Sequence, residues 1–297
     1  MIGPGQSQSL LAPAKINLTL QILGRRPDGY HELESLVAFA GTGDRLLVEP
    51  AEELIFEVTG PFAGQLAHAT GDNLVLAATR LLAQAAGIQP RVRLQLTKNL
   101  PVGAGLGGGS ADAAAVLQAL RALWGLSFSP DFLASLALPL GADLPVCLYG
   151  RPALMRGIGA RLTPAPPLPP LWLVLVNPGE SLATGCVYQA RQGPFSRPSD
   201  WWSCELPDAA TAARLLRAKP NDLQAPACGL CPSIGLVLAA LEKSPACLLA
   251  RMSGSGASCF GLYGREEEAQ AAAARLAADH PDWWVVAAPL LHLGSDS

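Results

Sequence analysis

Residues 101–110 read Pro-Val-Gly-Ala-Gly-Leu-Gly-Gly-Gly-Ser and carry the strongest chemical signal in the sequence. Five glycines fall within seven residues, after an alternating apolar stretch that ends near Lys98 and before a stretch of helical periodicity that starts near Ser110. Glycine permits positive φ angles and close backbone approach, and a helix N-terminus adds unpaired N–H groups and partial positive charge. The pattern predicts a phosphate-binding loop, with the Ser110 hydroxyl either capping the helix or facing a phosphate or Mg²⁺.

Other interpretations of the glycines fit less well. Gly103-x-Gly105-x-x-Gly108 has the form of a dinucleotide-binding fingerprint, but that motif normally follows the first strand of a βαβ unit, and here it lies about a third of the way along the chain. A Walker A loop would place Lys-Ser or Lys-Thr after the last glycine, where this chain has Ser110. A plain tight turn needs one or two glycines, and every further glycine raises the entropic cost of ordering.

Two charged residues stand in apolar surroundings. Asp143 lies within the apolar residues 138–148, where a carboxylate needs a partner. It is a candidate general base for a hydroxyl group, but an Asp between Gly-Ala and Leu-Pro is equally a cap, and spacing alone leaves both open. Lys15 follows Pro13-Ala14 at the start of an alternating stretch, where sequence alone favours a surface lysine at the mouth of a strand.

Composition excludes several classes of protein. Half of the 297 residues are hydrophobic and 15% are charged, which argues against a disordered chain and suits two domains or one large one. The net charge of −3, with no basic stripe, argues against a nucleic-acid partner. No apolar run approaches the ~18 residues that cross a bilayer, and the first ten residues show no secretory signal pattern.

The seven cysteines have irregular spacings and predict no disulfide framework, so we expect a soluble cytoplasmic enzyme. Cys228-x-x-Cys231 lacks the second pair or the spaced histidines of a zinc site, and we interpret both as ordinary residues.

Periodicity indicates the elements that position these residues. We expect strands over residues 16–22, 54–58, 92–96, 171–176, 259–263 and 284–289, and helices over residues 74–86, from 110 onward, 233–242 and 266–278. Asp72 or Asn73 is placed to cap the first helix. Strands and helices mix without strict βαβ alternation, which favours the α+β class. The Gly- and Pro-rich residues 150–170 predict a boundary between domains over residues 1–160 and 161–297, and residues 200–219 give no clear pattern.

The loop pattern Pro-x-Gly-x-Gly-Leu-Gly-Gly-Gly-Ser-x-Asp-Ala-Ala resembles the ATP loop of the GHMP kinases, which phosphorylate galactose, homoserine, mevalonate and related small molecules. Further matches follow in the family's order across nearly the whole chain, at residues 13–18 (PAKINL), 26–31 (RPDGYH), 72–75 (DNLV), 141–145 (GADLP) and 253–256 (SGSG). The glycine loop specifies only the superfamily. PAKIN together with DGYH resembles its branch in the non-mevalonate isoprenoid pathway, which acts on a cytidine diphosphate-linked methylerythritol.

The resemblance implies a fold and an activity. The fold is α+β, with an amino-terminal ATP-binding half similar to a ribosomal S5 second domain and a ferredoxin-like carboxy-terminal half. The activity is ATP-dependent phosphorylation of the 2-hydroxyl of the cytidine-linked substrate, with ATP and Mg²⁺ as cofactors, in a monomer or homodimer without nucleic-acid or membrane partners.

The resemblance also implies site residues. Asp143 is the implied catalytic base and Lys15 its charged partner. The implied substrate contacts are a stack on cytosine by Tyr30, edge hydrogen bonds from His31 and a second wall at Tyr188. Asn17 and Thr184 are candidate substrate contacts that could equally face solvent. The implied ATP contacts are Asn73, Lys98, Pro101, Val102, Gly103, Ala104, Gly105, Leu106, Gly107, Gly108, Gly109, Ser110 and Ala111.

Some details stay open. No residue is a firm Mg²⁺ ligand, and we expect Ser110, water and ATP to hold the ion. Asp112 suits the helix dipole but would repel phosphate, so we expect it to point away or act through Mg²⁺. Residues 253–256 are either a turn that packs near the phosphate loop or a simple hairpin turn. The rival functions are another GHMP enzyme, such as a homoserine or mevalonate kinase or the related decarboxylase, and a non-catalytic nucleotide or sugar sensor.

Overall fold

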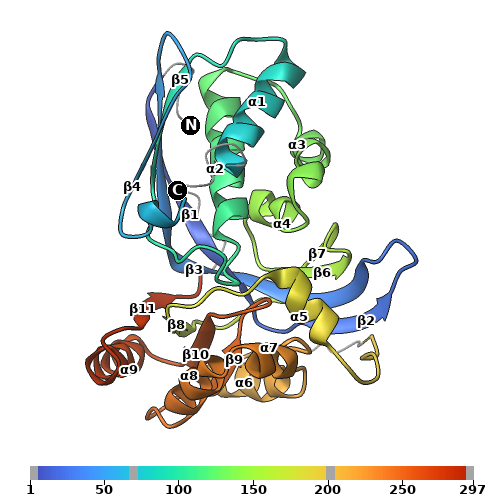
Figure 1. The fold of residues 1–297 in the computed structure, drawn as a ribbon, viewed down its shortest axis with the longest axis vertical. Helices are drawn as coiled ribbons and strands as arrows, with labels where there is room; N and C mark the ends of the chain where they lie inside the picture. The colour runs from blue at the N-terminus through green and yellow to red at the C-terminus, as the bar shows by residue number, and fades with distance from the viewer. Residues whose placement is uncertain (1–5, 67–72, 199–204, 292–297) are drawn as a thin grey trace. The chain divides into compact units, whose positions relative to one another are not determined.

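The computed structural model describes residues 6–66, 73–198 and 205–291. These form two compact units, which are described separately (Figure 1). The first unit takes the described residues of Met1–Ala14, Gly43–Val102 and Gly107–Gly150, and the second takes Lys15–Thr42, Gly103–Leu106 and the described residues of Arg151–Ser297. Strands β1 (Gln8–Asn17) and β3 (His31–Pro50) contribute residues to both units. The boundary at residue 160 stays a prediction.

The first unit combines a sheet with helices that follow the glycine loop. The second half of β3 pairs antiparallel with β5 (Val92–Thr97), and β4 (Ile55–Thr59) pairs parallel with β5. Helix α2 (Gly108–Leu123) contacts α1 (Leu74–Ala86) and α4 (Leu144–Tyr149), and α3 (Pro130–Ala137) contacts α4. Short 3₁₀ turns η1 (Ala63–Leu66) and η2 (Leu138–Leu140) complete the unit. The expected apolar face of α2 is buried, at Val116, Leu117, Leu120 and Leu123.

The second unit contains two antiparallel arrangements. The first half of β3 pairs with β2 (Gln21–Arg25) and β6 (Ala153–Gly157), and β6 pairs with β7 (Arg161–Pro164). A separate four-stranded sheet has the order β11 (Trp284–Pro289), β8 (Trp172–Asn177), β10 (Cys259–Tyr263), β9 (Leu249–Met252). Helix α8 (Ser233–Glu242) contacts β9 and β10, and α9 (Glu266–Asp279) contacts β8, β10 and β11. The remaining helices are α5 (Thr184–Ala190), α6 (Ala209–Arg217) and α7 (Gln224–Leu230).

Most of the strongly periodic elements are confirmed, and the α+β class with them. The strand expected over residues 16–22 is wrong as a single element, because β1 ends at Asn17 and β2 begins at Gln21. The alternation over residues 16–22 would also give this strand a polar face, at Asn17, Thr19 and Gln21, but these residues are each at most 6% exposed. Two of these side chains find partners inside the protein: Asn17 Nδ2 donates to Ser35 Oγ, and Thr19 Oγ1 accepts from the N–H of Leu36.

No helix in the described part of the chain is both long and apolar enough to cross a bilayer. Residues 209–217, within the stretch that gave no pattern, form the amphipathic helix α6. The expected cap at Asp72 lies outside the described residues, whereas Asn73 occupies the cap position of α1.

Candidate active site

Three successive carbonyls of the glycine loop are fixed by hydrogen bonds within the second unit. The donors are Lys15 in β1, Ser253 directly after β9 and Ser258 directly before β10. These bonds run from Ser258 N–H to Ala104 O (3.0 Å), from Ser253 Oγ to Gly105 O (3.0 Å) and from Lys15 N–H to Leu106 O (2.8 Å). Of the two alternatives for residues 253–256, the structure therefore supports the turn that packs near the phosphate loop.

The N–H groups of the same stretch are left available. Among the described residues, none accepts a hydrogen bond from the backbone N–H groups of residues 103–107. Gly103, Gly105 and Gly107 have φ angles of 66°, 76° and 62°, in the left-handed region that glycine adopts readily. Consecutive peptide groups with inward-bonded carbonyls and available N–H groups form a concave site for an anion. The loop can therefore bind phosphate oxygens through its main chain.

The first turn of α2 lies next to the segment that carries Asp143. Gly107 is the N-cap of α2 and Ser110 lies within its first turn, so Ser110 does not cap this helix. A Cβ atom on Gly141 would lie 3.8 Å from Ser110 Oγ. The first unit thus brings the end of the glycine loop and the start of α4 together. The Ser110 hydroxyl therefore lies close to Gly141, two residues before Asp143.

The structure does not support the alternatives of a helix cap for Asp143 and a surface lysine for Lys15. Asp143 is the N-cap residue of α4, but its side chain makes no capping hydrogen bond to that helix. Lys15 is 3% exposed within β1 and is not a surface lysine. A half-buried carboxylate that does not cap its helix suits general-base chemistry. The roles of Asp143 and Lys15 stay predictions.

Helix α5 presents two predicted substrate residues at i and i+4, which lie on one face of a helix. Thr184 Oγ1 is 2.9 Å from Ser255 Oγ. The Tyr188 and His31 rings lie with centroids 4.9 Å apart and planes tilted by 35°. The structure therefore brings together two of the three residues that the resemblance assigned to the cytosine site, His31 and Tyr188.

Tyr30 lies in the connection between β2 and β3, and His31 is the first residue of β3. The Tyr30 side chain is 61% exposed, and its N–H donates to Asp28 Oδ1 at 3.1 Å, which fixes the turn. Partial burial, then the positive charges of Arg25 and Arg191, lower the pKa of His31. A neutral imidazole has one donor and one acceptor, a combination that can read the edge of a base.

Asn17 carries an unused acceptor. Its backbone N–H donates to Ser253 Oγ at 3.2 Å and its Nδ2 donates to Ser35 Oγ at 2.8 Å. Its buried Oδ1 finds no donor among the described residues. A buried carbonyl without a donor is costly, so this atom is available to a polar substrate group.

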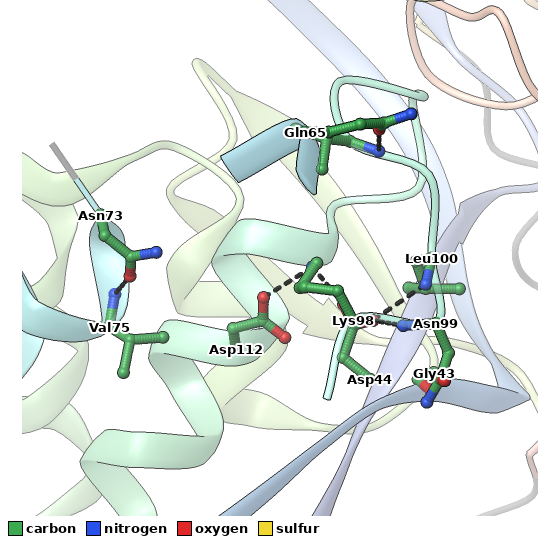
Figure 2. Close-up of polar contacts among 10 residues, drawn as sticks. Gly43, Asp44, Gln65, Asn73, Val75, Lys98, Asn99, Leu100 and Asp112 are labelled. Carbon is green, nitrogen blue, oxygen red and sulfur yellow. Dashed lines mark hydrogen bonds and ion pairs between the residues drawn. The ribbon is translucent and has the colours of Figure 1, made fainter. Parts of the chain in front are cut away.

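A buried ion cluster adjoins the loop in the first unit (Figure 2). Lys98 Nζ donates to Asp112 Oδ2 at 2.8 Å and forms a second ion pair with Asp44 Oδ2. Burial lowers the pKa of Lys98, but Asp112 and Asp44 outweigh it, so the pKa is raised overall. Burial raises the pKa of Asp112 to about 7, with Asp44 adding to the effect and Lys98 opposing it. The Asp112 carboxylate is thus paired with Lys98, which favours the first of its two alternatives, a side chain that points away from the phosphates.

Asp44 is the residue of this cluster that sequence patterns miss. It follows Gly43 in a long apolar stretch, where a Gly-Asp pair is typical of an exposed turn.

The side chain of Asn73, a predicted ATP contact, caps its own helix, because its Oδ1 accepts a hydrogen bond from the N–H of Val75 at 2.9 Å. Gly109 lies beside that helix start, since a Cβ atom there would be 3.4 Å from Leu74 Cδ1.

Mg²⁺ fits the site only as an ion shared with a nucleotide. Among the described residues, no group of three or more His, Cys, Asp or Glu side chains is arranged to hold a metal. Mg²⁺ is commonly bound by one or two protein oxygens together with substrate phosphates and water. The Ser110 hydroxyl is such an oxygen.

The six described cysteines are free, and Cys231 Sγ lies 3.2 Å from Glu180 Oε2.

Comparison with known proteins identifies the family. The N-terminal domain model of the GHMP kinases matches residues 73–151, and their C-terminal model matches residues 203–282. The 4-diphosphocytidyl-2-C-methyl-D-erythritol kinase of Paramagnetospirillum magneticum is 54% identical over 285 residues, which cover 96% of this chain and 99% of the relative. The chain belongs to the 4-diphosphocytidyl-2-C-methyl-D-erythritol kinase family of GHMP kinases. The resemblance inferred from its motifs is confirmed.

Solved structures agree with this family and its fold. A crystal structure of 4-(cytidine 5'-diphospho)-2C-methyl-D-erythritol kinase superposes with a TM-score of 0.78 at 40% identity, covering 95% of this chain and 99% of that one. Homoserine kinase from Cytophaga hutchinsonii has a TM-score of 0.70 at 18% identity, covering 98% of this chain and 96% of its own, and shares the fold alone. The two-domain GHMP kinase fold is confirmed.

Proposed function

We propose that this chain transfers the γ-phosphoryl group of ATP to the 2-hydroxyl of 4-diphosphocytidyl-2-C-methyl-D-erythritol, giving the 2-phosphate and ADP in isoprenoid precursor biosynthesis. The observation that carries the proposal is the 54% identity, over nearly the whole chain, to a relative named for this kinase. The geometry supports it independently, because the loop offers main-chain N–H groups to phosphate and α5 places Tyr188 against His31.

Phosphoryl transfer passes through a loose transition state, so positioning and charge stabilisation do most of the work. The N–H groups of residues 103–107 bind phosphate oxygens, and the N-terminus of α2 adds its dipole. Asp143 accepts the proton of the attacking hydroxyl, and the Lys15 ammonium polarises that hydroxyl. The Ser110 hydroxyl would help to hold a Mg²⁺ ion that arrives with ATP, and the ion would neutralise phosphate charge.

The cytidine group of the acceptor provides selectivity. Tyr30 stacks on the base, Tyr188 forms a second wall, and neutral His31 hydrogen-bonds its edge. Asn17 Oδ1 and the Thr184 hydroxyl supply further polar contacts. A site built to hydrogen-bond a group rejects analogues that lack it, because its own polar atoms would then stay unpaired.

The test is a coupled assay of ADP release with ATP, Mg²⁺ and a panel of acceptors. We expect turnover with the cytidine-linked substrate and none with homoserine, mevalonate or methylerythritol phosphate, with ³¹P NMR showing one new phosphate monoester. Turnover of homoserine or mevalonate would replace the proposal with another GHMP activity. ATP binding without turnover of any acceptor would support the sensor.

A further inference from the structure

The end of β5 and the start of α2 meet at one buried carboxylate (Figure 2). Asp44, on β3, has a fully buried side chain, and the Lys98 and Asp112 side chains are each 3% exposed. Burying ionised groups costs several kcal/mol for each ion unless all their hydrogen-bonding capacity is used. A buried cluster of three ionisable side chains beside the glycine loop is therefore costly, and we ask what it contributes to the loop.

Asp44 fixes the path of the chain into the glycine loop. Its Oδ1 accepts hydrogen bonds from the N–H groups of both Asn99, at 2.6 Å, and Leu100, at 2.9 Å. The Asn99 side chain adds a bond from Nδ2 to the carbonyl of Gly43 at 3.2 Å. Two of the three residues that connect β5 to Pro101 are thus attached to β3 by three hydrogen bonds.

The other oxygen of Asp44 reaches the far end of the same loop. Asp44 Oδ2 is paired with Lys98 Nζ, and Lys98 Nζ donates to Asp112 on α2. Gly108, the first residue of α2, packs on this pair, because a Cβ atom there would lie 3.4 Å from Lys98 Nζ and 3.5 Å from Asp44 Oδ2. The loop between Pro101 and Gly107 therefore starts and ends at positions set by the same three side chains.

We infer that Asp44 is a positioning residue for nucleotide binding: by fixing both ends of the glycine loop it sets the direction of the N–H groups that hold the phosphates. The inference rests on the proposed binding of ATP at this loop. A loop whose ends are fixed loses less conformational entropy when a ligand orders it, and its donors start near the bound geometry. Because its side chain is fully buried, Asp44 acts through the loop and not directly on a ligand.

Asp44→Asn tests the inference with little change of shape. The amide oxygen can still accept from Asn99 and Leu100, but the NH₂ group then faces the Lys98 ammonium, donor against donor. We expect the Kd of a non-hydrolysable ATP analogue to rise on the order of tenfold, because small misplacements of a site carry penalties up to 10²-fold. The KM of ATP should rise in parallel, while the KM of the cytidine-linked acceptor stays within about twofold.

Val48→Ala is the matched control for general destabilisation. Val48 is buried on the same strand, pairs with Leu94 and contributes no hydrogen bond to the loop connection. Its removal should lower the melting temperature without changing the Kd of the analogue. If Asp44→Asn does not fold, Asp112→Asn provides the measurement, since it weakens the Lys98 link but leaves the Asn99 and Leu100 bonds intact.

The outcomes separate this inference from the proposed function. Asp44→Asn or Asp112→Asn with wild-type analogue affinity overturns the positioning role, as does an equal loss of affinity in Val48→Ala. A wild-type chain that binds the analogue but transfers no phosphate to the acceptor overturns the proposed function only. A wild-type chain that binds no analogue overturns both.

Discussion

Gly105→Ala is the sharpest perturbation of the glycine loop. Gly105 has a φ angle of 76°, and a Cβ atom there would lie 2.4 Å from Ser253 O, 2.8 Å from Gly256 O and 2.9 Å from Gly256 N. All three atoms are backbone, so no side-chain rotation relieves the overlap. A left-handed conformation costs a residue with a Cβ about 1–2 kcal/mol, and forced overpacking typically costs about 1–3 kcal/mol more.

Gly103→Ala separates the two contributions. Gly103 has a similar φ angle of 66°, but a Cβ atom there would make only an ordinary contact, 3.5 Å from Ser181 Cβ. It should therefore show the conformational cost alone, about 1–2 kcal/mol. Gly105→Ala should lose about 2–5 kcal/mol in total, as the sum of that cost and the overlap.

Urea denaturation gives the free energy of unfolding, and titration with a non-hydrolysable ATP analogue gives affinity. We expect Gly105→Ala to lose more in both measurements than Gly103→Ala. The reasoning would be refuted if the two variants lost equal stability, because the overlap with residues 253–256 would then contribute nothing.

Three further predictions concern the chemistry. Asp143→Asn should lower kcat by on the order of 10²–10⁴-fold in the coupled assay, with the Kd of the ATP analogue little changed; near-wild-type kcat would remove Asp143 as the base. Tyr30→Ala should raise the KM of the cytidine-linked acceptor about 2–10-fold, the value of an aromatic contact, whereas Tyr30→Phe keeps the ring and should behave as wild type; an unchanged KM for the alanine variant excludes the stack. The Asp112 pKa of about 7 in the fold lies above its ordinary value of 3.8, so the folded state holds a proton that the unfolded state releases. Its contribution to stability is complete below about pH 4 and is lost as the pH rises to about 7, at roughly 1 kcal/mol per pH unit. Asp112→Asn should remove this slope in unfolding experiments across that range, and an identical slope in both proteins would contradict the burial described for Asp112.

Local patterns predict the elements whose periodicity is complete within a short window. Helix α8 and strands β10 and β11 have the predicted bounds, because apolar spacing, turn residues and element length all agree there. The strand over residues 16–22 fails for the opposite reason. Its alternation indicates one polar face in water, whereas tertiary hydrogen bonds to Ser35 and Leu36 bury that face.

The residues of the candidate site also differ in how far local sequence predicts them. The glycine loop is visible in sequence because its function requires an unusual residue type at several adjacent positions. Asp44 is invisible because its function depends on partners 54 to 56 residues away, and nothing in its own neighbourhood distinguishes it from a turn residue. Asp143 lies between these cases: its apolar context marks it, but only the structure shows that it does not cap α4.

The inward-bonded carbonyls at residues 104–106 have a consequence for how this site tolerates mutation. Recognition through peptide groups leaves no side chain that a codon change can delete. Phosphate binding at residues 104–106 is therefore lost chiefly through substitutions that add side-chain atoms to these residues.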